Sequence, residues 1–149
     1  MAIHKEHEKD RKPFVGITHG DFNSINYEII IKSLMEPKLL DFFTPIVYGS
    51  SKIASYYRKA LNLTDFNFNL IKNTESATPK RQHIVNVTEQ EIKIDMGEST
   101  TIAGELALTA LDMAVEDLKK NHIDVLVTAP INKKNIQSDK FAHNLFDGK

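Results

Sequence analysis

Two kinds of apolar pattern alternate along this chain and together predict its secondary structure. Short apolar runs bounded by turn-forming residues predict buried strands, whereas apolar residues that recur every three or four positions predict helices. The strand-like runs occupy residues 13–18, 44–50 and 123–129. Helical spacing is found in residues 25–35, in residues 53–61 and, most clearly, in residues 103–118. This order of strands and helices predicts an α/β fold with a largely parallel sheet.

The middle of the chain has a different pattern. Residues 66–71 alternate apolar with polar side chains, which is typical of a half-exposed strand. Residues 83–87 and 91–94 predict two further short strands, separated by a polar turn. We therefore expect this block to form a β excursion that lies beside the main sheet.

The N-terminal residues 1–12 carry charges of both signs and no apolar run, so we expect a flexible polar leader. His4 and His7 lie there among lysines and glutamates, and a solvated tail explains them better than a metal clip. Residues 13–149 are then expected to form one α/β domain. A chain of 149 residues with 41% hydrophobic content is sufficient for a single packed core.

Composition and charge exclude several classes of protein. The chain contains no cysteine, which excludes disulfides and thiolate metal sites. Its formal net charge of −1 argues against nucleic acid or an anionic membrane as the main partner. No apolar run approaches the roughly 18 residues of a membrane span, and the N-terminus lacks the apolar region of a signal peptide. We therefore expect a cytoplasmic protein that binds neither nucleic acid nor membranes.

Two of the predicted strands end in turns whose residues suit an anionic small molecule. All strands of an open parallel sheet point their carboxyl ends at one edge, so Thr18 and Thr128 should emerge on the same rim. Each turn leads to a helix start, where free backbone N–H groups favour an anion. Lys133 adds a full positive charge, and Asn132 can cap the helix or donate to a ligand. The alternative is a plain turn followed by a solvated helix start.

The first of these turns has features for and against an anion site. Gly20 allows the backbone to approach a ligand closely. Asp21 places negative charge there, so it either orients a hydroxyl or ammonium group of a ligand or only stabilises the helix start. His19 could serve as an acid or base, but no partner is evident, and we expect only a polar loop residue. The candidates for a substrate or phosphate rim are Thr18, Gly20, Asp21, Thr128, Asn132 and Lys133.

Three motifs, GITHGDFNSINYEIIIK, TPIVYGS and VTAPINKKNI, occur in this order, with the long helix between the last two. Over residues 13–141 the chain resembles the N-terminal part of the 4-hydroxythreonine-4-phosphate dehydrogenase family. The resemblance implies a two-domain, three-layer α/β/α subunit of the isocitrate-dehydrogenase-like kind, and residues 13–149 are then expected to be the N-terminal part of that larger fold, which this chain leaves incomplete. It also implies oxidation of a phosphorylated hydroxy-amino acid with NAD or NADP in vitamin B6 biosynthesis, followed by decarboxylation. A divalent metal held by histidines and a site completed across a homodimer are implied in the same way.

The chain departs from the family pattern in ways that bear on activity. Ser24 and Asn26 stand where the family's first loop has glycines, and their side chains are expected to obstruct close backbone approach. The family's Gly-His-Thr motif is missing, and His143 in KFAHNLFDGK does not take over its role. The family's metal-binding histidines have no counterpart either. No metal ligand and no catalytic residue is therefore assigned in this chain.

No Gly-x-Gly-x-x-Gly turn follows a strand, which argues against a Rossmann-type dinucleotide site. This agrees with the resemblance, because the family does not use that fingerprint. We therefore expect a member of the dehydrogenase family that is inactive as this chain alone. Two alternatives stay open: a non-catalytic remnant or phosphometabolite-binding module, and a dehydrogenase for a related four-carbon acid phosphate.

Overall fold

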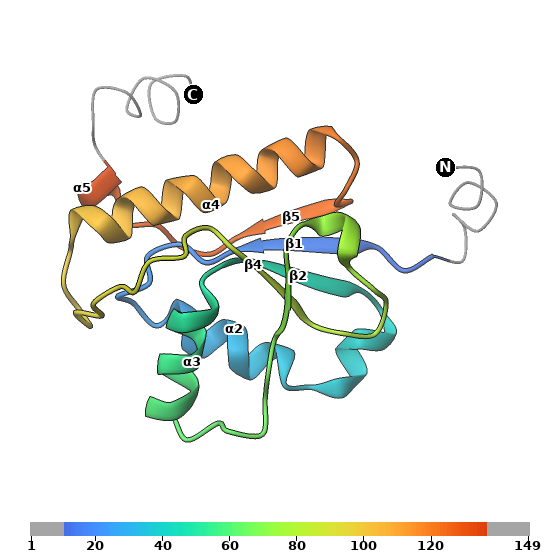
Figure 1. The fold of residues 1–149 in the computed structure, drawn as a ribbon, viewed down its shortest axis with the longest axis horizontal. Helices are drawn as coiled ribbons and strands as arrows, with labels where there is room; N and C mark the ends of the chain where they lie inside the picture. The colour runs from blue at the N-terminus through green and yellow to red at the C-terminus, as the bar shows by residue number, and fades with distance from the viewer. Residues whose placement is uncertain (1–10, 137–149) are drawn as a thin grey trace.

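A computed structural model describes residues 11–136, which form three layers around one five-stranded sheet (Figure 1). The strands are β1 (Phe14–Thr18), β2 (Thr44–Gly49), β3 (Asn69–Ile71), β4 (His83–Asn86) and β5 (Val125–Thr128). The helices are α2 (Asn26–Leu34), α3 (Ser51–Ala60), α4 (Thr101–Lys119) and α5 (Lys133–Ile136). Two short 3₁₀ helices are η1 (Pro37–Asp41) and η2 (Thr74–Ser76).

The strands lie in the order β3-β4-β2-β1-β5, and every neighbouring pair is parallel. Helices α2 and α3 lie on one face of the sheet, and α4 crosses the other face (Figure 1). β2 lies at the centre and is buried along its whole length, as expected for a parallel strand covered on both faces. The predicted three-layer α/β/α fold with a parallel sheet is confirmed.

The prediction for the middle of the chain was wrong in two respects. β3 and β4 belong to the main sheet, in which β4 pairs with both β2 and β3, so there is no separate β excursion. Residues 91–94 form no strand. Their apolar residues Ile92 and Ile94 pack against the core under α2 and α3, so the alternating pattern reflects contact with the core and not a sheet ladder.

The core on the α2 side is built by helix faces that the sequence pattern predicted only in part. Helix α2 buries Tyr27, Ile30, Ile31 and Leu34, and α3 adds three buried residues of its own. Ile29 belongs to the predicted apolar spacing, yet its side chain is 52% exposed. An exposed isoleucine at this position shows that, within residues 11–136, the sheet next to it is not fully covered.

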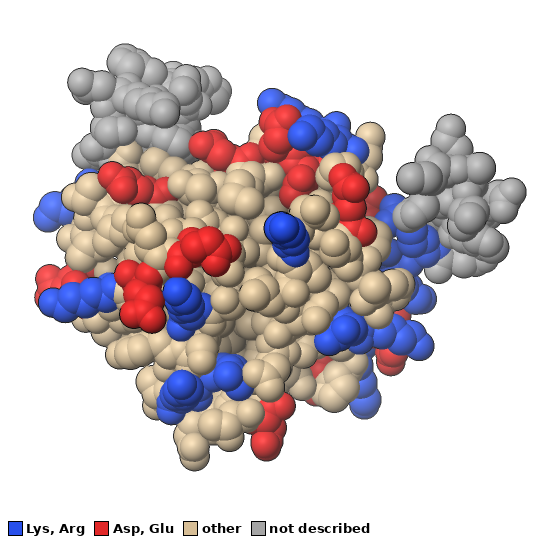
Figure 2. Space-filling model, in the orientation of Figure 1, with Lys and Arg blue, Asp and Glu red and all other residues tan. Residues whose placement is uncertain are grey.

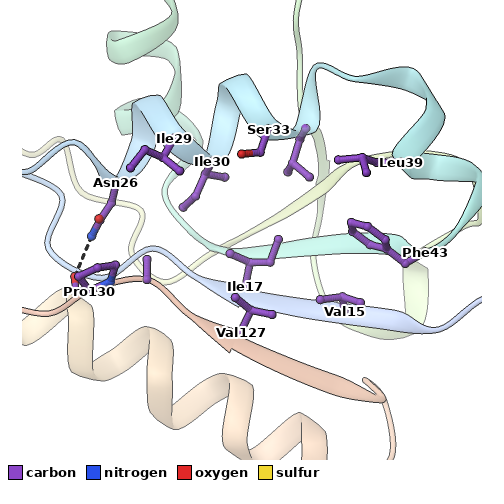
Figure 3. Close-up of a pocket in the computed structure, with 12 residues that line it drawn as sticks. Val15, Ile17, Asn26, Ile29, Ile30, Ser33, Leu39, Phe43, Val127 and Pro130 are labelled. Atoms are coloured by element: carbon purple, nitrogen blue, oxygen red, sulfur yellow. Dashed lines mark hydrogen bonds between the residues drawn. The ribbon is translucent and has the colours of Figure 1, made fainter.

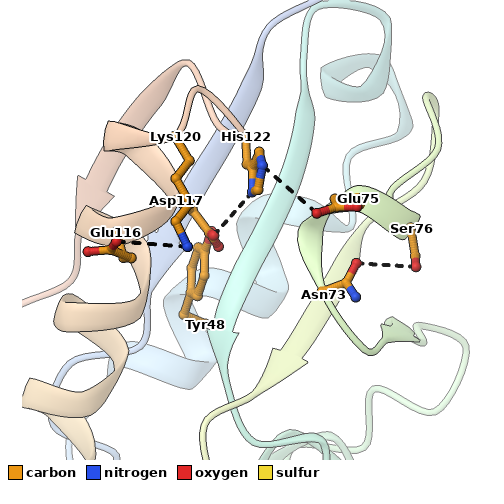
Figure 4. Close-up of polar contacts among 8 residues, drawn as sticks. All are labelled: Tyr48, Asn73, Glu75, Ser76, Glu116, Asp117, Lys120 and His122. Carbon is orange, nitrogen blue, oxygen red and sulfur yellow. Dashed lines mark hydrogen bonds and ion pairs between the residues drawn. The ribbon is translucent and has the colours of Figure 1, made fainter. Parts of the chain in front are cut away.

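On the other face, small residues of α4 let the helix approach the sheet closely. Ala110 and Ala114 are fully buried against the second core cluster. At the C-terminal end of α4, the Tyr48 hydroxyl donates to Asp117 at 2.7 Å, and His122 lies 3.4 Å from the same carboxylate (Figure 4). Burial, and then the hydrogen bond to Asp117, raise the pKa of Tyr48. The contact joins β2 to the end of α4 away from the predicted rim.

The predicted leader and the C-terminal residues are only partly covered. Residues 1–10 and 137–149, with His143 among them, lie outside the described residues. Arg11, at the end of the predicted leader, pairs with Asp124 at 2.9 Å. Lysines, arginines and acidic residues are interspersed over the face shown in Figure 2, with no field of one sign. None of the helices within residues 11–136 is long and apolar enough to cross a membrane.

Candidate functional site: the rim formed by the β1 and β5 turns

The carboxyl ends of β1 and β5 lie side by side, as the sequence predicted. Thr18 is the register partner of Thr128 in the parallel β1–β5 pair. The Ala129 amide donates to the Thr18 carbonyl at 3.1 Å, which extends the ladder into the second turn. The two threonines differ in access, because Thr18 is only 2% exposed whereas Thr128 is exposed. Of the pair, Thr128 is the one whose side chain is open to a ligand.

Gly20 brings the backbones of the two turns into contact. Its φ of +64° lies in the left-handed region that glycine tolerates best. A Cβ atom at this position would lie 2.3 Å from the Pro130 carbonyl oxygen, which leaves no room for a side chain. The next amide, that of Asp21, donates to the same Pro130 oxygen at 3.2 Å. From the sequence, Gly20 was expected to let the backbone approach a ligand closely. In the structure, Gly20 lets the backbones of the two turns approach each other closely.

Asn26 joins the turns by its side chain, a role that the sequence analysis missed. Its Nδ2 donates to the Pro130 carbonyl oxygen at 2.7 Å (Figure 3). The same nitrogen donates to the His19 carbonyl oxygen at 3.2 Å. Ser24 closes the same turn, because its hydroxyl donates to the Asp21 carbonyl at 2.6 Å and accepts from the Asn26 amide. The two side chains that replace family glycines therefore brace the turns. An asparagine after a Gly-Asp turn is the only sequence signal that could have suggested this.

The Asp21 carboxylate is engaged within the fold. Its Oδ1 accepts from the Asn23 amide at 2.9 Å, and its Oδ2 accepts from Asn135 Nδ2 at 3.1 Å. The residue is 5% exposed. Asn23 extends the network to the start of α4, since its Nδ2 donates to the Thr100 hydroxyl at 3.2 Å. These contacts hold the β1 turn against both the β5 turn and α4, and a role of Asp21 in binding a ligand stays a prediction.

His19 is a core residue and not the polar loop residue that the sequence suggested. It is fully buried, with Nε2 3.1 Å from the Leu106 carbonyl oxygen and Nδ1 2.7 Å from the Tyr27 hydroxyl. Because a carbonyl oxygen only accepts, Nε2 carries the proton and Nδ1 accepts from Tyr27. Burial lowers the pKa of His19 to about 4. A buried, neutral imidazole with both nitrogens engaged serves packing, so we assign it no acid–base role.

The β5 turn presents its candidate residues nearer the surface. Asn132 Oδ1 accepts from the Lys134 amide at 2.9 Å, so this side chain caps α5. Lys133 is exposed at the start of that helix. The helix has only four residues, so its dipole adds little to the attraction of an anion compared with the lysine charge. Thr128, Asn132 and Lys133 therefore form the open half of the rim.

Comparison with known proteins identifies the family of this chain. A family model described as "Pyridoxal phosphate biosynthetic protein PdxA" matches residues 41–145. The chain belongs to the PdxA family. This confirms the family resemblance that the three sequence motifs indicated.

Several relatives match most of this chain. A 4-hydroxythreonine-4-phosphate dehydrogenase from Bacteroides thetaiotaomicron is 42% identical over 134 residues, which are 90% of this chain and 36% of the relative. A Clostridium botulinum protein, named provisionally as a D-threonate 4-phosphate dehydrogenase, is 30% identical over 133 residues, 86% of this chain and 39% of its own length. The chain thus spans well under half the length of these curated relatives.

Solved structures of PdxA family dehydrogenases have the same fold. The 4-hydroxythreonine-4-phosphate dehydrogenase from Burkholderia phymatum matches with a TM-score of 0.71 at 26% identity, covering 85% of this chain and 38% of that one. The enzyme from Klebsiella pneumoniae matches with a TM-score of 0.66 at 26% identity, covering 84% and 39%. The fold described above is therefore shared with these dehydrogenases.

The metal that the family resemblance implies finds no fit in the part of the chain that is described. Within residues 11–136, no group of three or more histidine, cysteine, aspartate or glutamate side chains is placed to hold a metal ion. Asp21, the acidic residue among the rim candidates, is already bonded to Asn23 and Asn135. The described residues therefore serve as binding and bracing groups, and no chemical step is assigned to a metal here.

Proposed function

We propose that this chain forms the phosphate-binding rim of a PdxA family dehydrogenase that acts on 4-hydroxythreonine 4-phosphate. The observation that carries the proposal is the 42% identity with the Bacteroides thetaiotaomicron protein named for this activity. The geometry supports it, because the braced β1 turn holds the β5 turn in place at the carboxyl edge of the sheet. Ligands of open α/β sheets bind at that edge.

In this proposal the open half of the rim contacts the phosphate. Lys133 contributes a positive charge that reaches a phosphate oxygen, and the Thr128 hydroxyl donates a hydrogen bond. Asn132 fixes the start of α5, so that Lys133 is held near the β5 turn. Gly20 and Asp21 act one step away, by fixing the position of Pro130. Thr18, nearly buried, supports the ladder beside Thr128.

The cofactor and the assembly belong to the same proposal. NAD or NADP would accept the hydride from the substrate alcohol, which is chemistry that the protein positions and does not supply itself. The described residues of this chain include no assigned nicotinamide site, and the homodimer implied by the family is likewise a proposal. We accordingly expect the 149-residue chain to bind phosphorylated ligands without turnover. Measured reduction of NAD or NADP by the purified chain with 4-hydroxythreonine 4-phosphate would contradict this expectation.

A second candidate substrate is D-threonate 4-phosphate, a four-carbon acid phosphate. Relatives from Clostridium botulinum and Oceanobacillus iheyensis carry that provisional name at 30% and 32% identity. The higher identity to the Bacteroides thetaiotaomicron protein favours 4-hydroxythreonine 4-phosphate. The two compounds share the phosphate and differ by an amino or hydroxyl group, so the rim alone should bind both.

Thermal unfolding in the presence of ligands tests the proposal. We expect millimolar 4-hydroxythreonine 4-phosphate to raise the melting temperature, since a ligand that binds only the folded state stabilises it. Lys133→Ala should abolish most of this shift, whereas Lys72→Ala, at an exposed lysine after β3, should leave it unchanged. An equal shift in both variants, or no shift in the parent chain, would contradict the proposed rim.

A further inference from the structure

Helix α5 carries Lys133 but is too short to hold its own position. It has four residues, Lys133–Ile136, and an isolated helix of this length is not stable in water. The place of the Lys133 side chain relative to Thr128 therefore depends on the contacts that α5 makes with the rest of the fold. Those contacts are made to α4 and to the β1 turn.

The backbone of α5 lies directly against α4 at Gly104. A Cβ atom at Gly104 would lie 2.3 Å from the Asn135 carbonyl oxygen and 2.8 Å from its carbonyl carbon, so a larger residue has no room there. Ile136, the last residue of α5, is 2% exposed and anchors the end of the helix. One side of α5 is thus fixed by packing.

The Asn135 side chain joins α5 to the β1 turn. Its Nδ2 donates to Asp21 Oδ2 at 3.1 Å, although the two residues are 114 positions apart in the chain. The other oxygen of this carboxylate accepts from the Asn23 amide at 2.9 Å. Because Asp21 is only 5% exposed, water competes little for these hydrogen bonds. The carboxylate therefore connects the start of the chain's first turn to the helix that carries Lys133.

The same side chain contains an unpaired atom. Asn135 Oδ1 is buried and has no hydrogen-bond partner within residues 11–136. A buried amide oxygen without a partner lowers stability, so an asparagine is a poor choice at this position for stability alone. Its presence favours a role in fixing where α5 lies.

We propose that Asn135 is a positioning residue for phosphate binding, which holds α5, and with it Lys133, against the β1 turn through Asp21. This role rests on the proposed function, because Lys133 is the cation of the proposed rim. The Asp21 carboxylate then contacts Asn135 and not the ligand, and its negative charge opposes the phosphate. Its benefit is the place that it gives to Lys133, since the attraction between two charges falls with the distance between them.

The substitution Asp21→Asn separates positioning from charge. The new side chain has one oxygen, which cannot stand at the positions of both carboxylate oxygens, so the bond to Asn23 or the bond to Asn135 is lost. Removal of a negative charge near the rim would by itself strengthen phosphate binding. The lost anchor should instead weaken it by about fivefold or more, as expected for a lost hydrogen bond. Calorimetric titration of the 149-residue chain with 4-hydroxythreonine 4-phosphate measures this, and tighter binding would overturn the inference.

A second substitution should restore the bond with donor and acceptor exchanged. Asn135→Asp alone places two carboxylates side by side and should weaken binding by about tenfold or more. Combined with Asp21→Asn, it again pairs one amide with one carboxylate at unchanged net charge, and the affinity should return to within about threefold of the parent chain. Asn67→Asp, which adds the same charge at an exposed position before β3, should leave the affinity unchanged. A double variant as weak as the single variants would contradict the proposed role of Asn135.

The position of α5 can also be measured without a ligand. The chain has no cysteine, so Lys59→Cys on α3 and Lys134→Cys on α5 provide a defined pair of spin labels. Double electron–electron resonance should show a narrow distance distribution in the parent background and a broader one with Asn135→Ala. This substitution removes a partly exposed side chain and should leave the protein folded. An equally narrow distribution with Asn135→Ala would overturn the inference.

The titration and the distance measurement distinguish failure of this inference from failure of the proposed function. If the parent chain binds no ligand but the distance distribution broadens with Asn135→Ala, the phosphate rim is wrong and the anchoring of α5 by Asn135 stands. If the parent chain binds the ligand but neither measurement responds to substitution of Asn135, the rim stands and the positioning role is wrong.

Discussion

The two turns that meet at the rim differ in how the fold holds them. In the β1 turn, residues 19–23 are all buried, and its polar side chains bond to other parts of the protein. In the β5 turn, Thr128 and Pro130 are exposed, and the chain continues into a helix of a single turn. The comparison shows that the β1 turn braces the rim, whereas the β5 turn faces solvent.

This difference separates stability from binding. A substitution in the β1 turn removes buried contacts and should lower the free energy of unfolding. A substitution in the β5 turn changes exposed groups and should affect ligand binding with little cost in stability.

Gly20→Ala should destabilise the protein most, by about 3 kcal/mol, through left-handed strain and collision with the Pro130 carbonyl oxygen. Gly97→Ala is the matched control, since its φ is also positive, at +83°, but no atom lies within 4 Å of the added Cβ. The control substitution should lower the free energy of unfolding by about 1 kcal/mol, because it introduces backbone strain without a collision. Urea unfolding measures both, and equal losses would show that the two turns are not in close contact.

Acid should weaken the β1 turn through His19. Its pKa is lowered by burial from 6.5 to about 4, so between these values the unfolded state binds a proton that the folded state does not. Stability therefore falls as the pH drops from 7 to 4, by about 3 kcal/mol from this residue. His19→Gln should flatten the pH profile of unfolding by that amount. The pKa of His83 is also lowered by burial, so a smaller slope of the same sign should remain.

Asn26→Ala should lower the free energy of unfolding by about 2 kcal/mol. The substitution removes the buried side-chain hydrogen bonds that join the two turns and leaves their carbonyl acceptors without this donor. Ser33→Ala, at an exposed position of the same helix, should change stability by less than about 0.5 kcal/mol. Chemical denaturation distinguishes the two. A loss at Asn26 no larger than at Ser33 would mean that the bridge between the turns does not contribute to stability.

Thr128→Ala should have the smallest effect on stability, within about 0.5 kcal/mol, because its side chain is exposed. It should nevertheless reduce the rise in melting temperature caused by 4-hydroxythreonine 4-phosphate. Thr18→Ala, at the buried register partner, should show the opposite result, with about 1 kcal/mol of stability lost and the ligand shift retained. If both variants lost the ligand shift to the same extent, the contrast between the two halves of the rim would fail.

Much of the fold could be predicted from the sequence because apolar spacing reflects which side of an element is buried. The runs predicted at 13–18, 44–50 and 123–129 contain β1, β2 and β5, and the parallel order placed Thr18 beside Thr128. The same logic failed for residues 91–94. Their alternation places Ile92 and Ile94 on the core, and no strand neighbour is available.

The roles of polar residues in the β1 turn could not be predicted, because they depend on partners far apart in the chain. His19 is hydrogen-bonded to Leu106, Asp21 to Asn135, and Asn26 to Pro130. Local sequence around Asn26 suggested only that a side chain replaces a glycine and would obstruct the backbone. The space it fills exists only after the β5 turn has packed against the β1 turn.

Local periodicity and chain direction were sufficient to predict the α/β class, the parallel sheet and the edge at which the two turns meet. That the β1 turn is braced and the β5 turn is open could be seen only in the folded protein, because it depends on burial and on long-range hydrogen bonds. Among the described residues, α4 covers one face of β5 while the other face is exposed, which local sequence did not predict.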